Sequence, residues 1–266
     1  MGVITKISLQ QKLKDRYNIF IDEKYAFSVD ESVLIQFELR KGMELTDEKL
    51  AAIFQQDAVR QGMNAAIHFL SIRMRSEKEV RDFLVKKEVT NEAAEEVIRS
   101  LYRLSYLDDA QFAEAYANTQ MNTSDKGPQL IERELKEKGI ADVLIKKVLA
   151  PFEFRFQLEK SVKLAEKYRQ KYRNESLIIQ KQKIEQMLAR KGYSWNVIHE
   201  ALAESHPSEN EEEQIEALMY QVEKAHRRYS KFSDGEYRQK MKQALYRKGF
   251  SIDDIERALE RLQEES

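Results

Sequence analysis

The sequence contains no cysteine and little glycine or proline. The absence of cysteine from its 266 residues excludes disulfide bonds and thiolate metal sites. The 8 glycines and 3 prolines are too few turn-forming residues for a sheet-rich enzyme, whereas charged residues make up 34% of the chain. This composition is typical of long, solvated helices.

Several kinds of functional site are also missing. The histidines have no spacing typical of a metal site, so we expect no bound metal at His68, His199, His206 or His226. There is no GxGxxG or GxxxxGK[ST] phosphate loop and no serine in a nucleophile-elbow setting. Acidic clusters such as NEAAEE and SENEEEQ are usual on solvated helix faces. We therefore predict no enzyme, no catalytic residue and no cofactor.

Long apolar runs are absent as well. None approaches the length needed to span a membrane, and the start MGVITKISLQ lacks the apolar region of a signal peptide. A soluble, cytoplasmic protein is expected. The net charge of −1 argues against a polycation that coats DNA over its whole surface.

The first part of the chain differs from the rest. VITKISLQ, RYNIFID and YAFSVD are short, rich in β-branched or aromatic residues and partly alternating, so they are predicted strands, with a turn at Asp22–Lys24 between the last two. DESVLIQFEL is predicted to be a helix capped by Gly42. Thr46, followed by two acidic residues, marks the start of another helix.

A periodic pattern covers the remainder. Gly139, Gly192 and Gly249 are separated by 53 and 57 residues, and each follows a lysine. A leucine lies four residues before each glycine, an isoleucine six after and a leucine ten after, namely Leu135, Leu188 and Leu245, then Ile145, Ile198 and Ile255, then Leu149, Leu202 and Leu259. A weaker upstream copy has Leu84, Ala94 and Ile98, with Glu88 in the place of the glycine.

Each glycine is predicted to end a helix. Glycine adopts the left-handed conformation beyond a helix end at little cost, and the preceding lysine favours the negative end of the helix dipole. One large residue later, Ser194 and Ser251 stand where N-caps are expected, and Asp254 is placed to complete a capping box. The isoleucine and leucine that follow are four apart and share one face of the next helix.

A longer helix is predicted before each of these helix pairs, at 57–73, 108–122, 153–173 and 209–228. We therefore assign an N-terminal module to residues 1–56 and three-helix repeats one to four to residues 57–107, 108–152, 153–207 and 208–266. A single repeat of about 50 residues buries too little surface to be stable alone, so stacked repeats are expected. The predicted fold is mainly α, an elongated, curved array of tandem three-helix repeats with a small N-terminal α+β module.

Basic residues concentrate in repeats three and four. Residues 155–191 hold 11 lysines and arginines against 4 acids, and residues 224–249 hold 9 against 2. Tyrosines are interleaved with both runs, and several cations match between the repeats. The residues that we call the basic stripe are Arg169, Arg173, Lys181, Lys183, Arg190, Lys191, Arg227, Arg228, Arg238, Lys240, Arg247 and Lys248.

Three interpretations of the basic stripe are open on composition alone. Cations interleaved with aromatic rings can bind phosphates and stack on bases. They can equally bind an acidic groove on another protein, or simply form solvated helix faces with internal ion pairs. Lys181, Lys183, Arg238 and Lys240 lie within helices rather than at their ends, so no structural role is expected for them.

Three segments, LSIRMRSEKEVRDFL, LYRLSYLDDAQFAEAYA and GPQLIERELKEKGI, resemble the first two repeats of the RecX regulatory proteins of bacteria. In that family an Arg-Ser step opens a helix, a Leu-Asp-Asp step starts the next repeat, and a Glu-Leu helix closes on Lys-Gly-Ile. The matching residues here are Ser76, Leu107, Asp108, Asp109, Phe112, Ala113, Gly127, Glu134, Leu135, Gly139 and Ile140. RYNIFIDEKYAFSVDESVLIQFEL is similar to the N-terminal extension of longer members, so the resemblance spans nearly the whole chain.

The resemblance implies a regulator rather than an enzyme. RecX proteins bind the RecA recombinase, especially its filament on single-stranded DNA, and restrain filament growth, strand exchange and co-protease activity. RecA and its filament are thus the expected partners of a monomer with at most weak DNA binding, acting in recombinational repair and the SOS response. Many members carry arginines late in the first helix of repeat two, where this chain has ANTQMNTSDKG, so basic contacts are expected in repeats three and four. A direct single-stranded nucleic-acid-binding protein and a structural adaptor are the alternatives.

Overall fold

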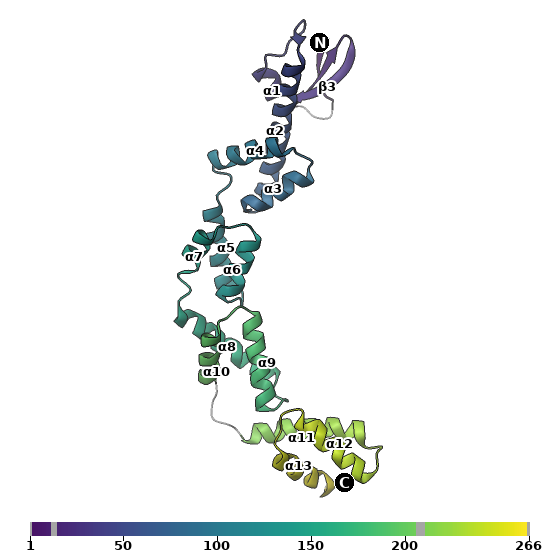
Figure 1. Ribbon diagram of the computed structural model, residues 1–266, viewed down its shortest axis with the longest axis vertical. Helices are drawn as coiled ribbons and strands as arrows, with labels where there is room; N and C mark the ends of the chain where they lie inside the picture. Colours follow the sequence, from purple (N-terminus) through teal and green to yellow (C-terminus); the bar gives the residue numbers. More distant parts are fainter. Residues whose placement is uncertain (1, 12–14, 206–210, 265–266) are drawn as a thin grey trace. The chain divides into compact units, whose positions relative to one another are not determined.

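The computed structural model describes residues 2–11, 15–205 and 211–264. His206 and the helix start expected at Glu209 lie outside these residues. The chain divides into two compact units, one running up to Tyr116 and including Leu135–Ile145, the other comprising Ala117–Glu134 and the chain from Lys146 onward. The expected class, mainly helical with a small strand-containing module at the N-terminus, is confirmed (Figure 1).

The N-terminal module contains an antiparallel sheet with the strand order β3-β2-β1-β4. Its strands are β1 (Gly2–Leu9), β2 (Arg16–Ile21), β3 (Lys24–Asp30) and the short β4 (Glu44–Leu45). The predicted turn between the second and third strands is confirmed, and both of its central residues, Asp22 and Glu23, have positive φ angles of 48° and 66°. A two-residue hairpin with two positive φ angles matches the natural twist of the strands.

A buried carboxylate helps to fix this sheet on helix α2 (Asp47–Ile72). Asp57 of α2 is 6% exposed. Its carboxylate accepts hydrogen bonds from the Asp30 backbone N–H at 2.8 Å and from the Arg16 guanidinium at 2.8 and 3.2 Å. Because a buried charge without partners is costly, these bonds specify how the sheet sits on the helix. Ile53 of α2 adds apolar contact with the core of the module.

Helix α1 (Glu31–Gln36) ends differently from the prediction. The expected cap was Gly42, but Glu38 takes the left-handed position, with φ 53°. The Leu39 backbone N–H then donates to the Leu34 carbonyl at 3.0 Å, which closes the helix end. Leu39 is 4% exposed, so the early turn serves to bring this leucine into the core of the module.

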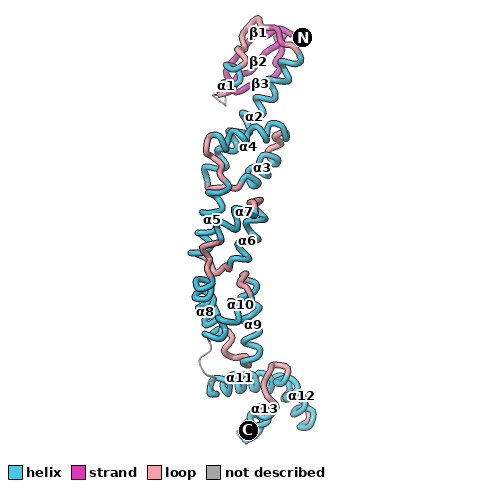
Figure 2. The backbone as a smooth tube through the Cα atoms, turned by 60° about the vertical axis from the view of Figure 1, so that its left-hand side comes forward, coloured by secondary structure: helices cyan, strands magenta, loops and turns pink. Residues whose placement is uncertain are grey.

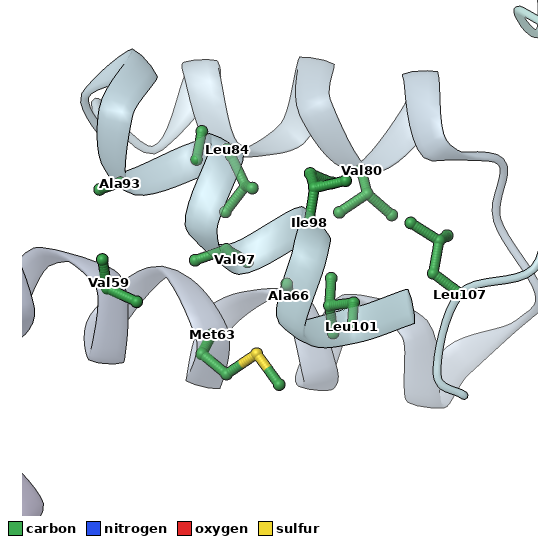
Figure 3. Packing of buried hydrophobic residues seen from close by; sticks show 11 residues of the cluster. Val59, Met63, Ala66, Val80, Leu84, Ala93, Val97, Ile98, Leu101 and Leu107 are labelled. Carbon is green, nitrogen blue, oxygen red and sulfur yellow. The ribbon is translucent and has the colours of Figure 1, made fainter. Parts of the chain in front are cut away.

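Helix α2 begins as predicted, with the Thr46 hydroxyl accepting from the Lys49 backbone N–H at 3.2 Å. It then continues unbroken to Ile72, so the assigned boundary after residue 56 falls inside one helix. The second half of α2 packs with α3 (Glu77–Lys86) and α4 (Asn91–Arg103) to form repeat one. Figure 3 shows side chains from all three helices directed toward one another around Ala66, Val97 and Leu101.

The remaining helices follow the predicted three-helix order. Those of repeat two are α5 (Asp109–Thr123), α6 (Pro128–Glu137) and α7 (Asp142–Leu149). Those of repeat three are α8 (Phe154–Lys171), α9 (Leu177–Arg190) and α10 (Trp195–Glu204). Those of repeat four are α11 (Glu211–Tyr229), α12 (Asp234–Tyr246) and α13 (Ile252–Glu264), which lie together around a common apolar core (Figure 2).

The predicted helix ends are confirmed at the three repeat glycines. Gly139, Gly192 and Gly249 have φ angles of 81°, 87° and 81°. In each case the residue after the glycine donates its N–H to the carbonyl of the periodic leucine, at 3.1, 3.2 and 3.4 Å. These leucines are 0 to 1% exposed, so one residue both accepts the closing bond and fills the core.

The predicted N-caps are confirmed in one of two cases. The Ser251 hydroxyl accepts from the Asp254 backbone N–H at 3.1 Å and donates to the Asp254 carboxylate at 2.5 Å. Ser194 occupies the N-cap position of α10, but its side chain makes no capping hydrogen bond, and that part of the prediction is wrong.

Candidate interaction surface

The basic stripe is distributed over the first two helices of repeats three and four. Helix α8 carries Arg169, and Arg173 follows its end. Helix α9 carries Lys181, Lys183 and Arg190, and Lys191 is its C-cap. In repeat four, α11 carries Arg227 and Arg228, α12 carries Arg238 and Lys240, and Arg247 and Lys248 follow it.

Helical geometry separates some of these cations. Lys181 and Arg190 are nine residues apart, which corresponds to about two and a half turns, so they lie on opposite sides of α9. Lys183 and Arg190 are seven residues apart, about two turns, and share a side. Arg238, Lys240 and Arg247 repeat this arrangement in repeat four. The matched cations of each repeat therefore lie on two sides of its second helix rather than along one side.

Solvent exposure divides the basic stripe further. Its exposed members are Arg173, Lys181, Arg190, Arg227, Arg228, Arg238 and Arg247. Arg227 forms a loose ion pair with Glu223 of its own helix, at 3.6 Å. Arg169 is half-buried, and burial lowers the pKa of its guanidinium from the ordinary value. The exposed members are the ones available to a large partner.

Three lysines of the basic stripe are instead held in ion pairs. The Lys183 ammonium pairs with the Glu175 carboxylate, whose other oxygen lies 3.9 Å from Lys248. Lys191 pairs with Asp125 at 3.2 Å. Lys183, for which no structural role is expected from its mid-helix position, therefore has an ion-pair partner outside α9. The reason is tertiary, because its partner sits in the turn before α9 and reaches back to the helix.

Aromatic rings lie beside several cations of the basic stripe, as the interleaved sequence indicated. The Lys183 ammonium is 5.2 Å from the centre of the Tyr172 ring, and in repeat four Lys240 is 4.4 Å from the Phe232 ring. Arg228 lies 5.5 Å from the Tyr229 ring. Cation–π attraction at such distances favours an ordered cation on a ring face.

The Lys-Gly helix ends also contact the preceding repeat, which the sequence did not reveal. At the first junction, the Lys78 ammonium at the start of α3 donates to the Glu137 carbonyl at the end of α6, at 2.9 Å. Lys138, the lysine before the repeat glycine, pairs with Glu79 of α3 at 3.1 Å. The second helix of repeat two thus ends against the start of the second helix of repeat one.

The junction between repeats two and three has the same design. The Gly127 backbone N–H donates to the Lys191 carbonyl at 2.7 Å, and the Gln129 N–H donates to the Gly192 carbonyl at 3.1 Å. The end of α9 therefore meets the start of α6, with its carbonyls facing free N–H groups. Opposite ends of two helix dipoles face each other in this arrangement, which is favourable. A Cβ atom on Gly192 would overlap the backbone of Leu130.

At the junction between repeats three and four, a helix end again meets a helix start, but the hydrogen-bond donor is a side chain instead of a backbone N–H. The Ser176 hydroxyl at the start of α9 donates to the Lys248 carbonyl at 2.5 Å. Gly249 lies against this hydroxyl, which a Cβ atom would meet at 2.6 Å. Ser176 is 2% exposed, so its hydroxyl is largely shielded from water.

These junctions explain why repeat one tolerates Glu88 at the glycine position. Glu88 has φ 59°, and the closing bond from the Val89 N–H to the Leu84 carbonyl is present at 3.1 Å. No earlier repeat precedes repeat one, and Glu88 is exposed. An exposed side chain is therefore accommodated at this position. At the other three positions glycine is needed both for its φ angle and for close approach.

The acidic partners at the junctions are the residues that sequence reasoning missed. Glu79 is the third residue of α3, Asp125 lies three residues before α6, and Glu175 lies two before α9. Their spacing from the helix start differs in every repeat. No periodic signal in the sequence could have identified them.

No group of three or more histidine, aspartate or glutamate side chains within the described ranges is arranged to hold a metal ion. Nor does any helix in the described part of the chain have the length and apolar character needed to cross a bilayer.

Comparison with protein families gives matches along most of the chain. Residues 2–46 match the regulatory protein RecX N-terminal domain, 63–101 the first and 108–149 the second three-helix domain of RecX. The third three-helix domain matches twice, at 157–202 and 211–259, so repeats three and four are of one kind.

Similar proteins and structures agree with these matches. Regulatory protein RecX of Bacillus licheniformis is 48% identical over 260 residues, covering 98% of this chain and 99% of the relative. That of Geobacillus is 43% identical over 268 residues, covering 99% and 98%. A crystal structure of regulatory protein RecX, 37% identical, matches with a TM-score of 0.65 over 76% of this chain and 100% of that one. Four matching domains in family order and identity above two fifths over the full length establish that this chain belongs to the RecX family of regulatory proteins.

Proposed function

We propose that this protein binds the RecA recombinase, above all the RecA filament on single-stranded DNA, and restrains its growth, strand exchange, ATPase and co-protease activities. Membership of the RecX family supports a regulatory role. The observation that supports contact with a filament is the recurrence of exposed cations, at Lys181 and Arg190 and again at Arg238 and Arg247. On this proposal the protein works as a monomer in the cytoplasm, where RecA and its DNA are found.

Recurrence matters because a filament is itself repetitive. Two repeats that offer the same cations can each make a weak contact with the same filament. The second contact then forms at high effective concentration, which raises the overall affinity without any strong single contact. A near-neutral chain, with net charge −1, also avoids indiscriminate binding to bare DNA.

The first test is the ATPase activity of RecA on single-stranded DNA. A protein that blocks filament growth should lower this activity at amounts well below one molecule per RecA subunit. Absence of an effect at every ratio would defeat the proposal, as would ATP hydrolysis by the purified protein alone.

The second test separates binding from folding. The variant Lys181→Gln, Arg190→Gln, Arg238→Gln, Arg247→Gln should melt within a few degrees of wild type, because exposed surface changes are usually worth less than about 0.5 kcal/mol each. Its affinity for RecA filaments should fall, with a weaker salt dependence. A matched control removes the same charge from exposed lysines outside the basic stripe, namely Lys41, Lys86, Lys146 and Lys147. Equal affinities of the two variants would contradict the role of the four cations.

Direct binding of single-stranded nucleic acid is the second candidate function. The paired cations and rings of Lys183 with Tyr172 and Lys240 with Phe232 favour it, because a base can stack where a ring and a cation already meet. Titration of bare and RecA-coated single strands over a salt series separates the two functions. Tighter binding to the bare strand would favour the second.

A further inference from the structure

One carboxylate holds two lysines of the basic stripe at the junction of repeats three and four. Glu175 lies in the turn between α8 and α9, and its two oxygens face Lys183 of repeat three and Lys248 of repeat four. A third cation, Lys171, lies 5.8 Å from the ring of Tyr172, which also lies beside Lys183. Two lysines thus lie beside the Tyr172 ring, and Glu175 pairs with one of them and with Lys248.

We propose that this junction is a phosphate-binding site, and that the Glu175 carboxylate occupies it in the free protein. A carboxylate and a phosphodiester present the same features to a lysine, namely a negative charge shared by two acceptor oxygens. The inference deepens the proposed function, on which it rests for the choice of phosphodiester as the ligand. It adds that the chain carries its own competitor for that ligand.

The contacts of Glu175 are suited to exchange. Its side chain is 20% exposed, and those of Lys183 and Lys248 are 38% and 41% exposed, so water screens both pairs. Ion pairs that are exposed to this degree contribute little net stability. Among the hydrogen bonds of the described residues, the Glu175 carboxylate accepts one from Lys183 alone, and Lys248 lies 3.9 Å away, beyond hydrogen-bond distance. A strand that supplies several phosphates at once can therefore replace it.

The backbone of the junction does not depend on the carboxylate. The Ser176 hydroxyl donates to the Lys248 carbonyl, and the Leu177 N–H donates to the Gln214 side chain at 3.1 Å. These bonds hold the two repeats together whichever anion faces the lysines. Exchange of Glu175 for a phosphate thus requires side-chain rotation and no separation of the repeats.

The experiment measures binding of a fluorescent oligothymidylate, without RecA, over a salt series. Glu175→Gln should bind more tightly than wild type. Its log–log salt slope should be steeper by about 1.4, since each of two added phosphate contacts on a single strand contributes about 0.7. Its advantage over wild type should accordingly shrink about sevenfold between 50 and 200 mM salt.

The matched control is Glu185→Gln, which removes the same charge from α9 without releasing a lysine. It should raise the affinity only through the overall charge and leave the slope near that of wild type. Adding Lys183→Gln and Lys248→Gln to Glu175→Gln should abolish the gain, whereas the same two changes in wild type should cost little. Equal behaviour of the two glutamate variants, or a gain that survives loss of both lysines, would overturn the proposal.

Two further measurements complete the design. Glu175→Asp keeps the charge but shortens the reach, so it should also tighten binding, and far-UV circular dichroism checks that each variant is folded. Competition of inorganic tripolyphosphate with the oligothymidylate shows whether the site binds free phosphates or requires a nucleic-acid strand. If Glu175→Gln binds neither the oligothymidylate nor tripolyphosphate more tightly than wild type does, the site is refuted. Because RecA is absent, a failure here leaves RecA inhibition untouched, and a failure to inhibit RecA leaves this result standing.

Discussion

Gly192 and Gly249 have nearly the same backbone conformation but very different neighbours. Substitution by alanine should therefore lower the free energy of unfolding by different amounts at the two positions. Their φ angles are 87° and 81°. A Cβ atom at Gly192 would overlap the backbone of Leu130, with the Leu130 Cα at 2.9 Å, whereas at Gly249 the nearest atom is the Ser176 hydroxyl, which can rotate. Backbone cannot move aside without opening the junction between repeats two and three.

The magnitudes follow from the bonds at each junction. The left-handed conformation costs a residue with a Cβ atom about 1–2 kcal/mol at either position. At Gly192 the two backbone bonds from Gly127 and Gln129 are lost in addition, at about 1 kcal/mol each. At Gly249 the bond at risk is that from the Ser176 hydroxyl to the Lys248 carbonyl, again worth about 1 kcal/mol. We expect Gly192→Ala to cost about 3–4 kcal/mol and Gly249→Ala about 2–3 kcal/mol.

Urea unfolding measures both variants within the same compact unit. Far-UV circular dichroism follows the helices, and the fluorescence of Trp195, the single tryptophan, follows repeat three, because it opens α10 three residues after Gly192. Gly235→Ala is the control, since a Cβ atom there meets nothing within 4 Å. It should leave the stability unchanged or slightly raised, because alanine is the better helix former.

The outcome that refutes the reasoning is specific. If Gly192→Ala and Gly249→Ala lose the same free energy of unfolding to within about 0.5 kcal/mol, the junction contributes nothing beyond the φ angle. If Gly192→Ala unfolds like wild type, the close packing of α9 against α6 is absent in solution.

Three other changes test separate features. The buried Tyr193 hydroxyl has no hydrogen-bond partner in the described structure, and burial raises its pKa to about 12. Because burying an unsatisfied hydroxyl is unfavourable, Tyr193→Phe should leave the free energy of unfolding unchanged or raise it by up to about 1 kcal/mol. Burial alone would raise the pKa of Glu79, but bonds from Arg73, Lys138 and the Ser76 N–H outweigh it and hold the pKa at about 2, against an ordinary 4.5. Its stabilising effect is therefore complete above pH 4.5 and lost as the pH falls toward 2, and acid unfolding of Glu79→Gln should lack that loss. Glu88→Gly should raise the melting temperature slightly, because glycine removes the cost of a left-handed residue while that position faces no other helix; a lower melting temperature would contradict this.

The sequence also allowed one inference about the basic stripe that spacing alone supports. Lys181 and Arg190 are nine residues apart, and any helix must place such a pair on opposite sides. The placement of these cations on two sides of the helix is thus a local property. It could have been predicted from residue numbers once the helix was assigned.

The sequence by itself determined the features whose hydrogen bonds and backbone conformation involve residues close together in the chain. The helix ends at Gly139, Gly192 and Gly249 depend on a left-handed residue and on a leucine four positions earlier, so the period and the order of the helices are visible in one dimension. The turn at Asp22–Glu23 and the cap at Thr46 are local for the same reason.

Only the tertiary structure decided which charges are available. Lys248 and Glu175 are 73 residues apart, and Lys191 and Asp125 are 66 apart, yet both pairs meet where one repeat ends against another. Coulomb attraction depends on distance in space, and composition gives no information about that distance. A lysine that is counted as part of a basic surface can therefore be held by an acid from another repeat, and the packing of the repeats decides which lysines are held in this way.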